Sequence, residues 1–155
     1  MSYIEKSIQI NVPVKAAYNQ WTQFEEFPRF MEGVTEVRQL DDKRLFWRAE
    51  IGGHETEWHA EIVDQTPDER IAWRHLRGAE NAGAVLFEPI PEGTRVTLTI
   101  VYTPEGAVES FGDALGFVAR RVGDDLRRFK ELIETRGHAT GAWRGEIHGR
   151  EVTRG

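Results

Sequence analysis

The chain has 155 residues, a length that fits one domain with a hydrophobic core of its own. Hydrophobic residues make up 39% and charged residues 30%, which is typical of a folded globular protein, and the formal net charge of -6 excludes the broad positive surface that nucleic acid or anionic lipid requires. The absence of cysteine excludes disulfides, thiol nucleophiles and cysteine zinc sites.

The N-terminal part of the chain predicts one strand followed by two short helices. Isoleucines alternate with polar neighbours over residues 3–10, which is the period of a strand with one buried face. Pro13 then precedes a segment whose apolar residues recur at helical spacing as far as Trp21. Residues 24–31 place three phenylalanines and a methionine around Pro28, and this pattern indicates a second short helix or an apolar loop.

Residues 34–103 predict six strands joined by short turns. The alternation of apolar and polar residues breaks at sequences typical of turns, namely Asp41-Asp42, Gly52-Gly53, Thr66-Pro67-Asp68, Gly78 to Asn81, and Pro91-Glu92-Gly93. Short turns connect antiparallel neighbours, because parallel strands need long crossover connections. Together with the first strand, these six predict a sheet of seven antiparallel strands.

The C-terminal part predicts one long helix and then a tail. After Pro104 the apolar residues step by three or four, at Phe111, Leu115, Val118, Val122, Leu126, Phe129 and Ile133. Residues 137–155 are rich in glycine and show no period, so we expect a tail that neither the sheet nor the helix needs. The domain is therefore expected to comprise residues 1–136.

The order of these elements predicts an α+β helix-grip fold. In this fold a curved, seven-stranded antiparallel sheet wraps around the long C-terminal helix, two short helices follow the first strand, and a cavity is enclosed. Blocks spread over most of residues 4–136 resemble the SRPBCC superfamily: NVPVKAAYNQW, FPRFMEGVTEV, ERIAWR, NAGAVLFEPI, GTRVTLTI and RRFKELIE. This superfamily includes START-like, polyketide cyclase/dehydrase-like and coenzyme Q-binding proteins, and the resemblance implies a cavity for a hydrophobic molecule.

A two-residue hairpin turn at 52–53 would set the register of the two strands around it. Counting outward from the turn pairs Ile51 with His54 and Trp47 with Trp58. The face with both tryptophans is expected to lie inside, because the opposite face is mostly charged. Extending the alternation places inside Trp47, Ala49, Thr56, Trp58, Ala60, Ile62, Ile71, Trp73, His75, Val85, Phe87, Val96, Leu98, Ile100 and Tyr102.

The inner surface combines very large with very small side chains, a mixture that outlines a cavity or else interlocks as ordinary core. On the final helix Gly112, Gly116, Ala119 and Gly123 lie beside the apolar stripe. Interior glycine costs about 0.5–1 kcal/mol relative to alanine, so these residues either leave room for a ligand or let the helix press on the sheet. The expected ligand-binding residues are Trp47, Thr56, Trp58, Trp73, His75, Phe87, Tyr102, Phe111, Leu115, Gly116 and Val118.

We expect no catalytic residue, no metal site and no cofactor. His54 and His59 are five residues apart on a strand and point to opposite faces, so they do not form the helical zinc-protease motif. Glu50 and Glu55 lie opposite each other at an exposed hairpin end, where two carboxylates spread into water and make a poor acid/base pair. The chain also has no nucleophile triad, phosphate loop or dinucleotide-binding glycine motif.

Three functions remain open. The first is non-enzymatic binding, for transport or sequestration, of a lipid, quinone or polyketide in the cavity, as the resemblance implies. The second is a polyketide aromatase/cyclase acting on a poly-β-ketone; such relatives are thought to orient carbonyls with inward arginines and hydroxyls, whereas our register turns Arg48 and Arg74 outward. The third is a stress-related assembly or chaperone module that holds a protein segment against residues 24–31 and Trp143.

The expected partner is a hydrophobic small molecule rather than nucleic acid. No apolar run reaches the length of an integral membrane segment, and the first residues lack the pattern of a signal peptide. We therefore expect a cytoplasmic protein that acts as a monomer or homodimer.

Overall fold

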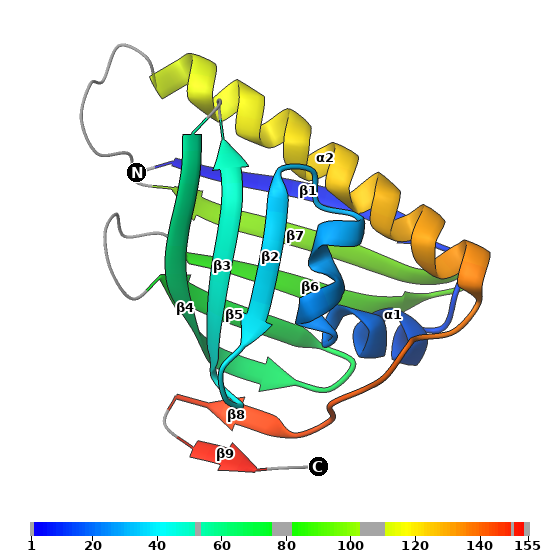
Figure 1. Ribbon diagram of the computed structural model, residues 1–155. Coiled ribbons are helices and arrows are strands. Elements are labelled where there is room, and N and C mark those ends of the chain that lie inside the picture. Colours follow the sequence, from blue (N-terminus) through cyan, green and yellow to red (C-terminus); the bar gives the residue numbers. More distant parts are fainter. Residues whose placement is uncertain (1, 52–53, 76–81, 103–110, 150, 154–155) are drawn as a thin grey trace.

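A computed structural model describes residues 2–51, 54–75, 82–102, 111–149 and 151–153 (Figure 1). The elements in chain order are β1 Ser2–Ile10, α1 Val14–Trp21, the 3-10 helix η1 Phe24–Arg29, β2 Val34–Gln39, β3 Arg44–Ile51, β4 His54–Thr66, β5 Arg70–His75, β6 Ala82–Ile90, β7 Gly93–Tyr102, α2 Phe111–Arg136, β8 Glu146–His148 and β9 Glu151–Thr153.

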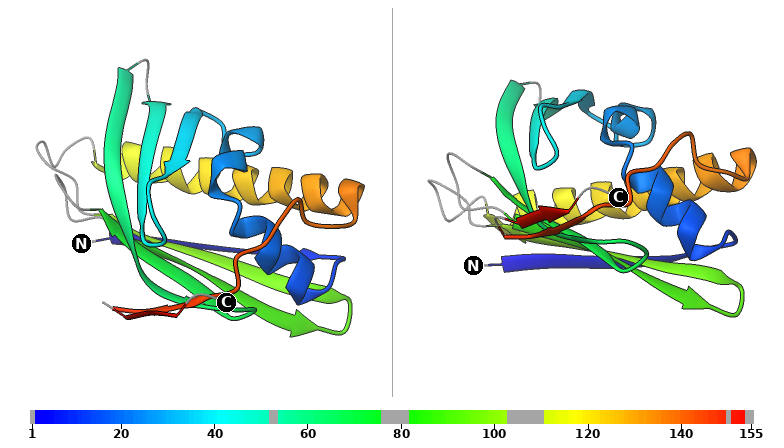
Figure 2. Two further views of the ribbon diagram at one scale, coloured as in Figure 1. Left: turned by 60° about the horizontal axis from the view of Figure 1, so that its bottom comes forward. Right: turned by 90° about the horizontal axis from the view of Figure 1, so that it is seen from below.

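The first seven strands form one antiparallel sheet in the order β1-β7-β6-β5-β4-β3-β2. In the right-hand view of Figure 2 the sheet bends, so that β2, β3 and β4 stand up from β1, β6 and β7 and α2 lies within the bend. The predicted α+β helix-grip fold, with two short helices after the first strand, is confirmed. Among the described residues, no helix has both the length and the apolar character needed to cross a membrane.

The register expected from the turn at 52–53 is confirmed. Ile51 pairs with His54 and Trp47 pairs with Trp58 across β3 and β4. Ala49, which lies between Trp47 and Ile51 on β3, is only 2% exposed, so this face of the strand is buried. The tryptophans therefore share the inner face because an antiparallel ladder puts directly opposed residues on the same side.

A β-bulge in β4 changes which residue of this strand points inward. The register against β5 shifts between Ile62 and Asp64. Beyond the shift Gln65 lies opposite Ile71, and both are buried. A strand without the bulge would bury the carboxylate of Asp64, which instead lies on the outer side and accepts a hydrogen bond from Arg70 Nε at 2.8 Å.

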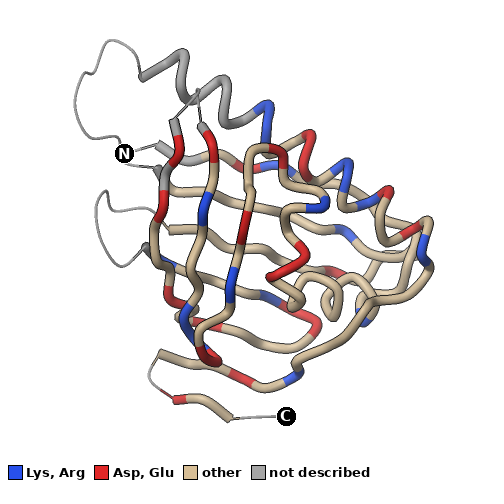
Figure 3. Tube along the Cα trace, in the orientation of Figure 1, with Lys and Arg blue, Asp and Glu red and all other residues tan. Residues whose placement is uncertain are grey.

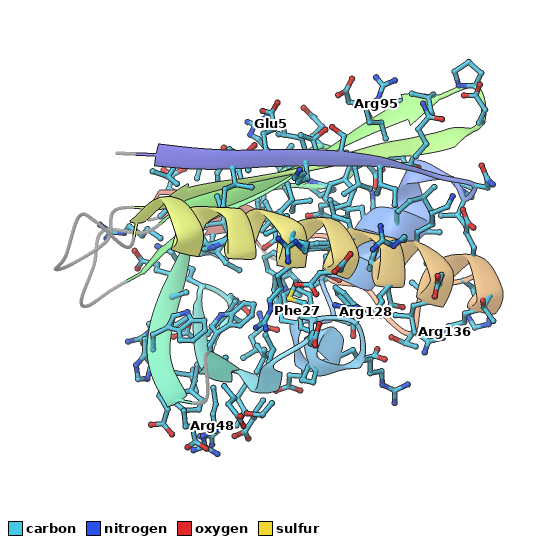
Figure 4. All side chains as sticks on the ribbon, turned by 90° about the horizontal axis from the view of Figure 1, so that it is seen from above. Glu5, Phe27, Arg48, Arg95, Arg128 and Arg136 are labelled. Carbon is cyan, nitrogen blue, oxygen red and sulfur yellow. The ribbon has the colours of Figure 1, made fainter. Side chains whose placement is uncertain are left out.

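The outer face of the sheet carries paired charges. Charged residues of both signs follow α2 and the strands β2, β3 and β4 (Figure 3). Arg48 lies on the side turned away from α2 (Figure 4) and contacts Glu57 at 2.8 Å and Glu36 at 3.1 Å. Arg74 contacts Glu61 at 2.9 Å on the same face. Both arginines thus point outward, as the register predicted.

Aromatic side chains from three elements fill the core next to α1. The ring centroid of Trp21 lies 4.9 Å from that of Phe129 on α2, and Phe30 lies 5.1 Å from Phe129. Phe24, Phe27 and Phe30 are 4%, 3% and 2% exposed. These three rings belong to the hydrophobic core, so they are not exposed for the contact with a protein segment that the third open function requires.

Residues 137–155, which we expected to form a tail, instead include two short strands, and β8 joins the sheet; whether folding needs this segment stays a prediction. The chain leaves α2, passes α1 and adds β8 to β4, where Gln65 pairs with Ile147 (Figure 1). Ile147 is fully buried and Trp143 is partly buried against the core. Arg144, on the segment between α2 and β8, forms an ion pair with Asp68 at 2.7 Å, and this contact holds the segment in place. The physical reason is an open edge: β3 stops pairing with β4 at Glu61, so the rest of β4 needs another partner.

Candidate functional site

An apolar cavity of about 170 Å³ lies in the interior of the described part of the chain. Its lining residues come from strands β3, β4, β5 and β7, from α1, from η1 and the loop after it, and from α2. The described residues that line it are Trp21, Phe24, Phe27, Met31, Leu45, Trp47, Trp58, Ile62, Ile71, Trp73, Leu98, Ile100, Val122 and Asp125. With the exception of one carboxyl group, this wall is built from aliphatic, aromatic and thioether side chains.

Three tryptophans on adjacent strands form one wall of the cavity. The rings of Trp47 and Trp58 are stacked, with centroids 5.6 Å apart and an interplanar angle of 11°. Trp73 follows on β5, where the register sets it beside Gly83 of β6. A Cβ atom at Gly83 would lie 2.5 Å from Cζ2 of Trp73, so the glycine is what allows the indole to lie flat on its neighbour strand.

Asp125 on α2 is the one ionisable group among the described residues of the cavity wall. Its carboxyl is 13% exposed, and Oδ1 accepts hydrogen bonds from the backbone N–H of Glu32 at 3.1 Å and from Arg128 at 2.6 Å. Burial raises the pKa of Asp125 to about 6, although these hydrogen bonds and the nearby charges of Arg128 and Arg121 act in the opposite direction. The group therefore changes charge close to neutral pH.

Asp125 and Arg128 connect the loop before β2 to α2. Arg128 Nε donates to the carbonyl of Phe30 at 2.9 Å, and its guanidinium lies 3.7 Å from Glu32. Figure 4 shows Arg128 reaching from α2 toward the helix that carries Phe27. Gly33 follows with φ of 87°, a left-handed conformation that glycine tolerates best. These contacts position Met31 at the cavity.

A comparison with models of protein families shows to which family the chain belongs. Residues 10–131 match the family model described as polyketide cyclase/dehydrase and lipid transport. The chain belongs to this family. The resemblance to the SRPBCC superfamily inferred from the sequence is thereby confirmed. The match begins at the last residue of β1 and ends within α2, so it covers strands β2 to β7, both short helices and every described residue that lines the cavity.

Relatives of this family member are similar over nearly their whole length. A Streptomyces lincolnensis protein, named as an uncharacterized 17.2 kDa protein in the melC2-rnhH intergenic region, is 48% identical over 149 residues, which are 95% of this chain and 99% of the relative. The solved structure of DR_A0006 from Deinococcus radiodurans is 31% identical with a TM-score of 0.69, covering 87% of this chain and 98% of its own.

A more distant solved structure has the same fold. The Zhui aromatase/cyclase from Streptomyces sp. R1128 is 15% identical, with a TM-score of 0.77, covering 91% of this chain and 98% of its own. At this identity the likeness shows the shared fold and carries nothing about the activity of this family member.

The structure brings part of the expected ligand-binding set together. Trp47, Trp58 and Trp73 line the cavity. Phe87 also points inward, but it packs at 5.3 Å on Tyr18 and is not among the described residues of the cavity wall. The remaining expected residues have side chains outside the described part of the chain, and these are Thr56, His75, Tyr102, Phe111, Leu115, Gly116 and Val118.

Sequence reasoning missed Asp125, although a signal was present. Position 125 lies three residues after Val122 and four before Phe129, which places it on the inward stripe of the helix. A charged residue at such a position is uncommon and points to a partner or a function. On the same helix Gly123 has no atom within 4 Å of a Cβ built on it, so this glycine does not serve close packing against the sheet.

No described group of three histidine, aspartate or glutamate residues is arranged to hold a metal ion. Glu50 lies opposite Glu55 at the end of β3, as the register predicted, and Glu55 contacts Arg48 at 3.7 Å. His59 packs against Phe46 on the outer face, with ring centroids 5.4 Å apart. Of the carboxylates in the described part of the chain, Asp125 is therefore the one that can act on a molecule in the cavity.

Proposed function

We propose that the protein binds a hydrophobic small molecule in the cavity and acts as a carrier or store rather than as an enzyme. The observation that carries the proposal is the cavity itself, about 170 Å³ in size and walled by Trp47, Trp58 and Trp73. Its family description, which names lipid transport beside polyketide cyclisation, supports the same function. Apolar pockets with very few polar groups are the usual form of such binding sites.

The energetic cost of the cavity supports this function. Unfilled apolar space costs roughly 24 cal/mol per Å³ in lost packing, so a cavity of this size forgoes about 4 kcal/mol. That cost is a large fraction of the net stability of a small domain. A molecule that fills the cavity restores these contacts, and an evolved protein has a reason to keep the space when it is used for binding.

Tryptophan fluorescence and thermal melting test the proposal together. We expect aromatic and isoprenoid ligands to change the emission of the wall tryptophans and to raise the melting temperature, because a ligand at 100 times its Kd stabilises the folded state by about 2.7 kcal/mol. Trp143→Phe is the matched control, since Trp143 does not line the cavity. The emission change should persist in that variant and shrink in Trp58→Phe. A panel without any binder would refute the proposal.

A polyketide cyclase is the second candidate, and Asp125 is the observation that favours it. A carboxylate whose pKa is about 6 is suited to remove a proton beside a carbonyl group. The outward positions of Arg48 and Arg74 speak against it, because they leave the described wall without a cation to orient carbonyls. The test is exchange in D₂O of the acidic C–H protons of a bound β-diketone, followed by NMR. Exchange accelerated by the protein and lost in Asp125→Asn would favour the cyclase.

A further inference from the structure

Asp125 gives the cavity a polar end. The other described residues that line the cavity are apolar or aromatic, whereas the carboxyl group of Asp125 is a strong hydrogen-bond acceptor. The hydrogen bonds from the backbone of Glu32 and from Arg128 are both accepted by Oδ1. A carboxylate has a second oxygen with lone pairs of its own, and Oδ2 can accept a hydrogen bond from a molecule in the cavity.

The size of the cavity limits what can bind. An engineered apolar cavity of about 150 Å³ in another protein holds benzene, so about 170 Å³ accommodates one six-membered ring with small substituents. The stacked rings of Trp47 and Trp58 form a flat wall, and flat aromatic molecules pack well against such a surface.

We propose that the cavity selects a single-ring aromatic molecule that carries a hydroxyl group, and that Asp125 accepts the hydrogen bond from this hydroxyl. The inference rests on the proposed binding function and adds to it the chemical class of the ligand. A buried hydroxyl without a partner is costly, and a hydrogen bond to a charged acceptor is stronger than one to a neutral acceptor. Asp125 is therefore a specificity-determining residue in this proposal.

Three matched compounds test the selection: p-cresol, p-xylene and 4-methylanisole. p-Xylene replaces the hydroxyl by a methyl group, and 4-methylanisole keeps the oxygen but cannot donate. We expect p-cresol to bind at least about tenfold more tightly than p-xylene at pH 8, as measured by calorimetric or NMR titration, which is about 1.4 kcal/mol. Without a polar partner the order reverses, because p-xylene is the more hydrophobic of the two.

Two variants of neighbouring helix residues assign the effect to Asp125. Asp125→Asn keeps the size of the side chain and removes its charge, and we expect the preference for p-cresol over p-xylene to fall at least about fivefold while the affinity for p-xylene changes less than about twofold. Asp124→Asn is the control, since Asp124 pairs with Arg127 outside the cavity wall. It should leave all three affinities unchanged.

The wild-type protein provides a second measurement if Asp125→Asn does not fold. The charged groups that face Asp125 are Arg128 and Arg121 on α2 and Glu32 on the adjoining loop. Burial raises the pKa of Asp125 to about 6, so lowering the pH from 8 to 5 protonates it. We expect p-cresol to bind more weakly at pH 5, 4-methylanisole to bind more tightly because a carboxylic acid can donate, and p-xylene to be unaffected.

The outcomes separate the inference from the function on which it rests. If none of the three compounds binds, the inference is refuted, and the fluorescence panel decides whether the proposed function stands. If all three bind and p-xylene binds most tightly at both pH values, the hydroxyl selection is overturned while the proposed function stands. If p-cresol binds more tightly than p-xylene at pH 8, and this preference falls at pH 5 and in Asp125→Asn, both the inference and the proposed function are supported.

Discussion

The two ends of the interior use the same kinds of residue in different ways. Next to α1, Trp21 meets Phe129 edge to face at 4.9 Å and 70°. At the cavity, Trp47 and Trp58 lie parallel, at 5.6 Å and 11°. The rings of Trp21 and Phe129 come from two helices and meet at a steep angle, whereas rings paired across two neighbouring strands lie side by side on one face. Trp21 belongs to both ends, since it packs edge to face on Phe129 and also lines the cavity.

The largest expected effect separates these two ends. Phe129→Ala should lower the free energy of unfolding by about 3–5 kcal/mol, because it leaves a void in closely packed core. Trp58→Ala should lower the free energy of unfolding by no more than about 2 kcal/mol. The variant loses the stacking on Trp47, but the indole of Trp58 is only partly buried in the wild type. Chemical denaturation of both variants measures the difference. Equal costs would show that the cavity end is packed as tightly as the core.

The docked C-terminal segment gives the next effect in size. Ile147→Ala should lower the free energy of unfolding by about 2–4 kcal/mol, because Ile147 is the fully buried residue of β8. Val152→Ala in the partly buried β9 is the matched control and should cost less than about 1 kcal/mol. Removal of residues 140–155 should weaken folding at least as much as Ile147→Ala does. A truncated protein with unchanged unfolding would mean that β8 adds nothing to β4.

A pH experiment examines the polar end of the cavity. Because burial raises the pKa of Asp125 to about 6 in the folded protein, its ionisation opposes folding as the pH rises from about 4 through 6. Asp125→Asn should therefore be more stable than the wild type at pH 8, by about 1–3 kcal/mol, and equal to it near pH 4.

Glu134→Gln is the control with the opposite sign. Hydrogen bonds from Lys130 and from the backbone of Asn11 lower the pKa of Glu134, although desolvation opposes them. The stability that this carboxylate contributes is present at pH 8 and is lost as the pH falls through its lowered pKa.

A variant Asp125→Asn that is less stable than the wild type at pH 8 would contradict the sign expected for Asp125.

Two glycines with different surroundings provide a pair of variants with opposite expected signs. Gly83→Ala should cost about 1–3 kcal/mol and weaken ligand binding, because a Cβ there displaces the indole of Trp73. Gly123→Ala on α2 should stabilise the protein by about 0.5–1 kcal/mol, since the new methyl group has no atom within 4 Å beyond its own stretch of helix and the helix gains propensity. Thermal melts of the two variants should shift in opposite directions.

Local patterns determined most of the fold. The alternation along β1 to β7 predicted seven antiparallel strands, and the glycine pair at 52–53 set Trp47 against Trp58. These features follow from the sequence because a strand has a period of two and a two-residue turn leaves one register. The outward direction of Arg48 and Arg74 follows from the same count, as does the inward position of Trp73.

Contacts between distant segments were decided by the tertiary structure. Gln65 is buried because of a bulge in β4, and Ile147 is buried because β3 leaves the end of β4 unpaired. Asp125 faces the cavity because the curvature of the sheet and the loop at Glu32 enclose that turn of α2, which gives its carboxyl both burial and hydrogen-bond donors. Periodicity describes one element at a time. It does not contain the free edge, the bulge or the enclosed volume that arise when elements meet.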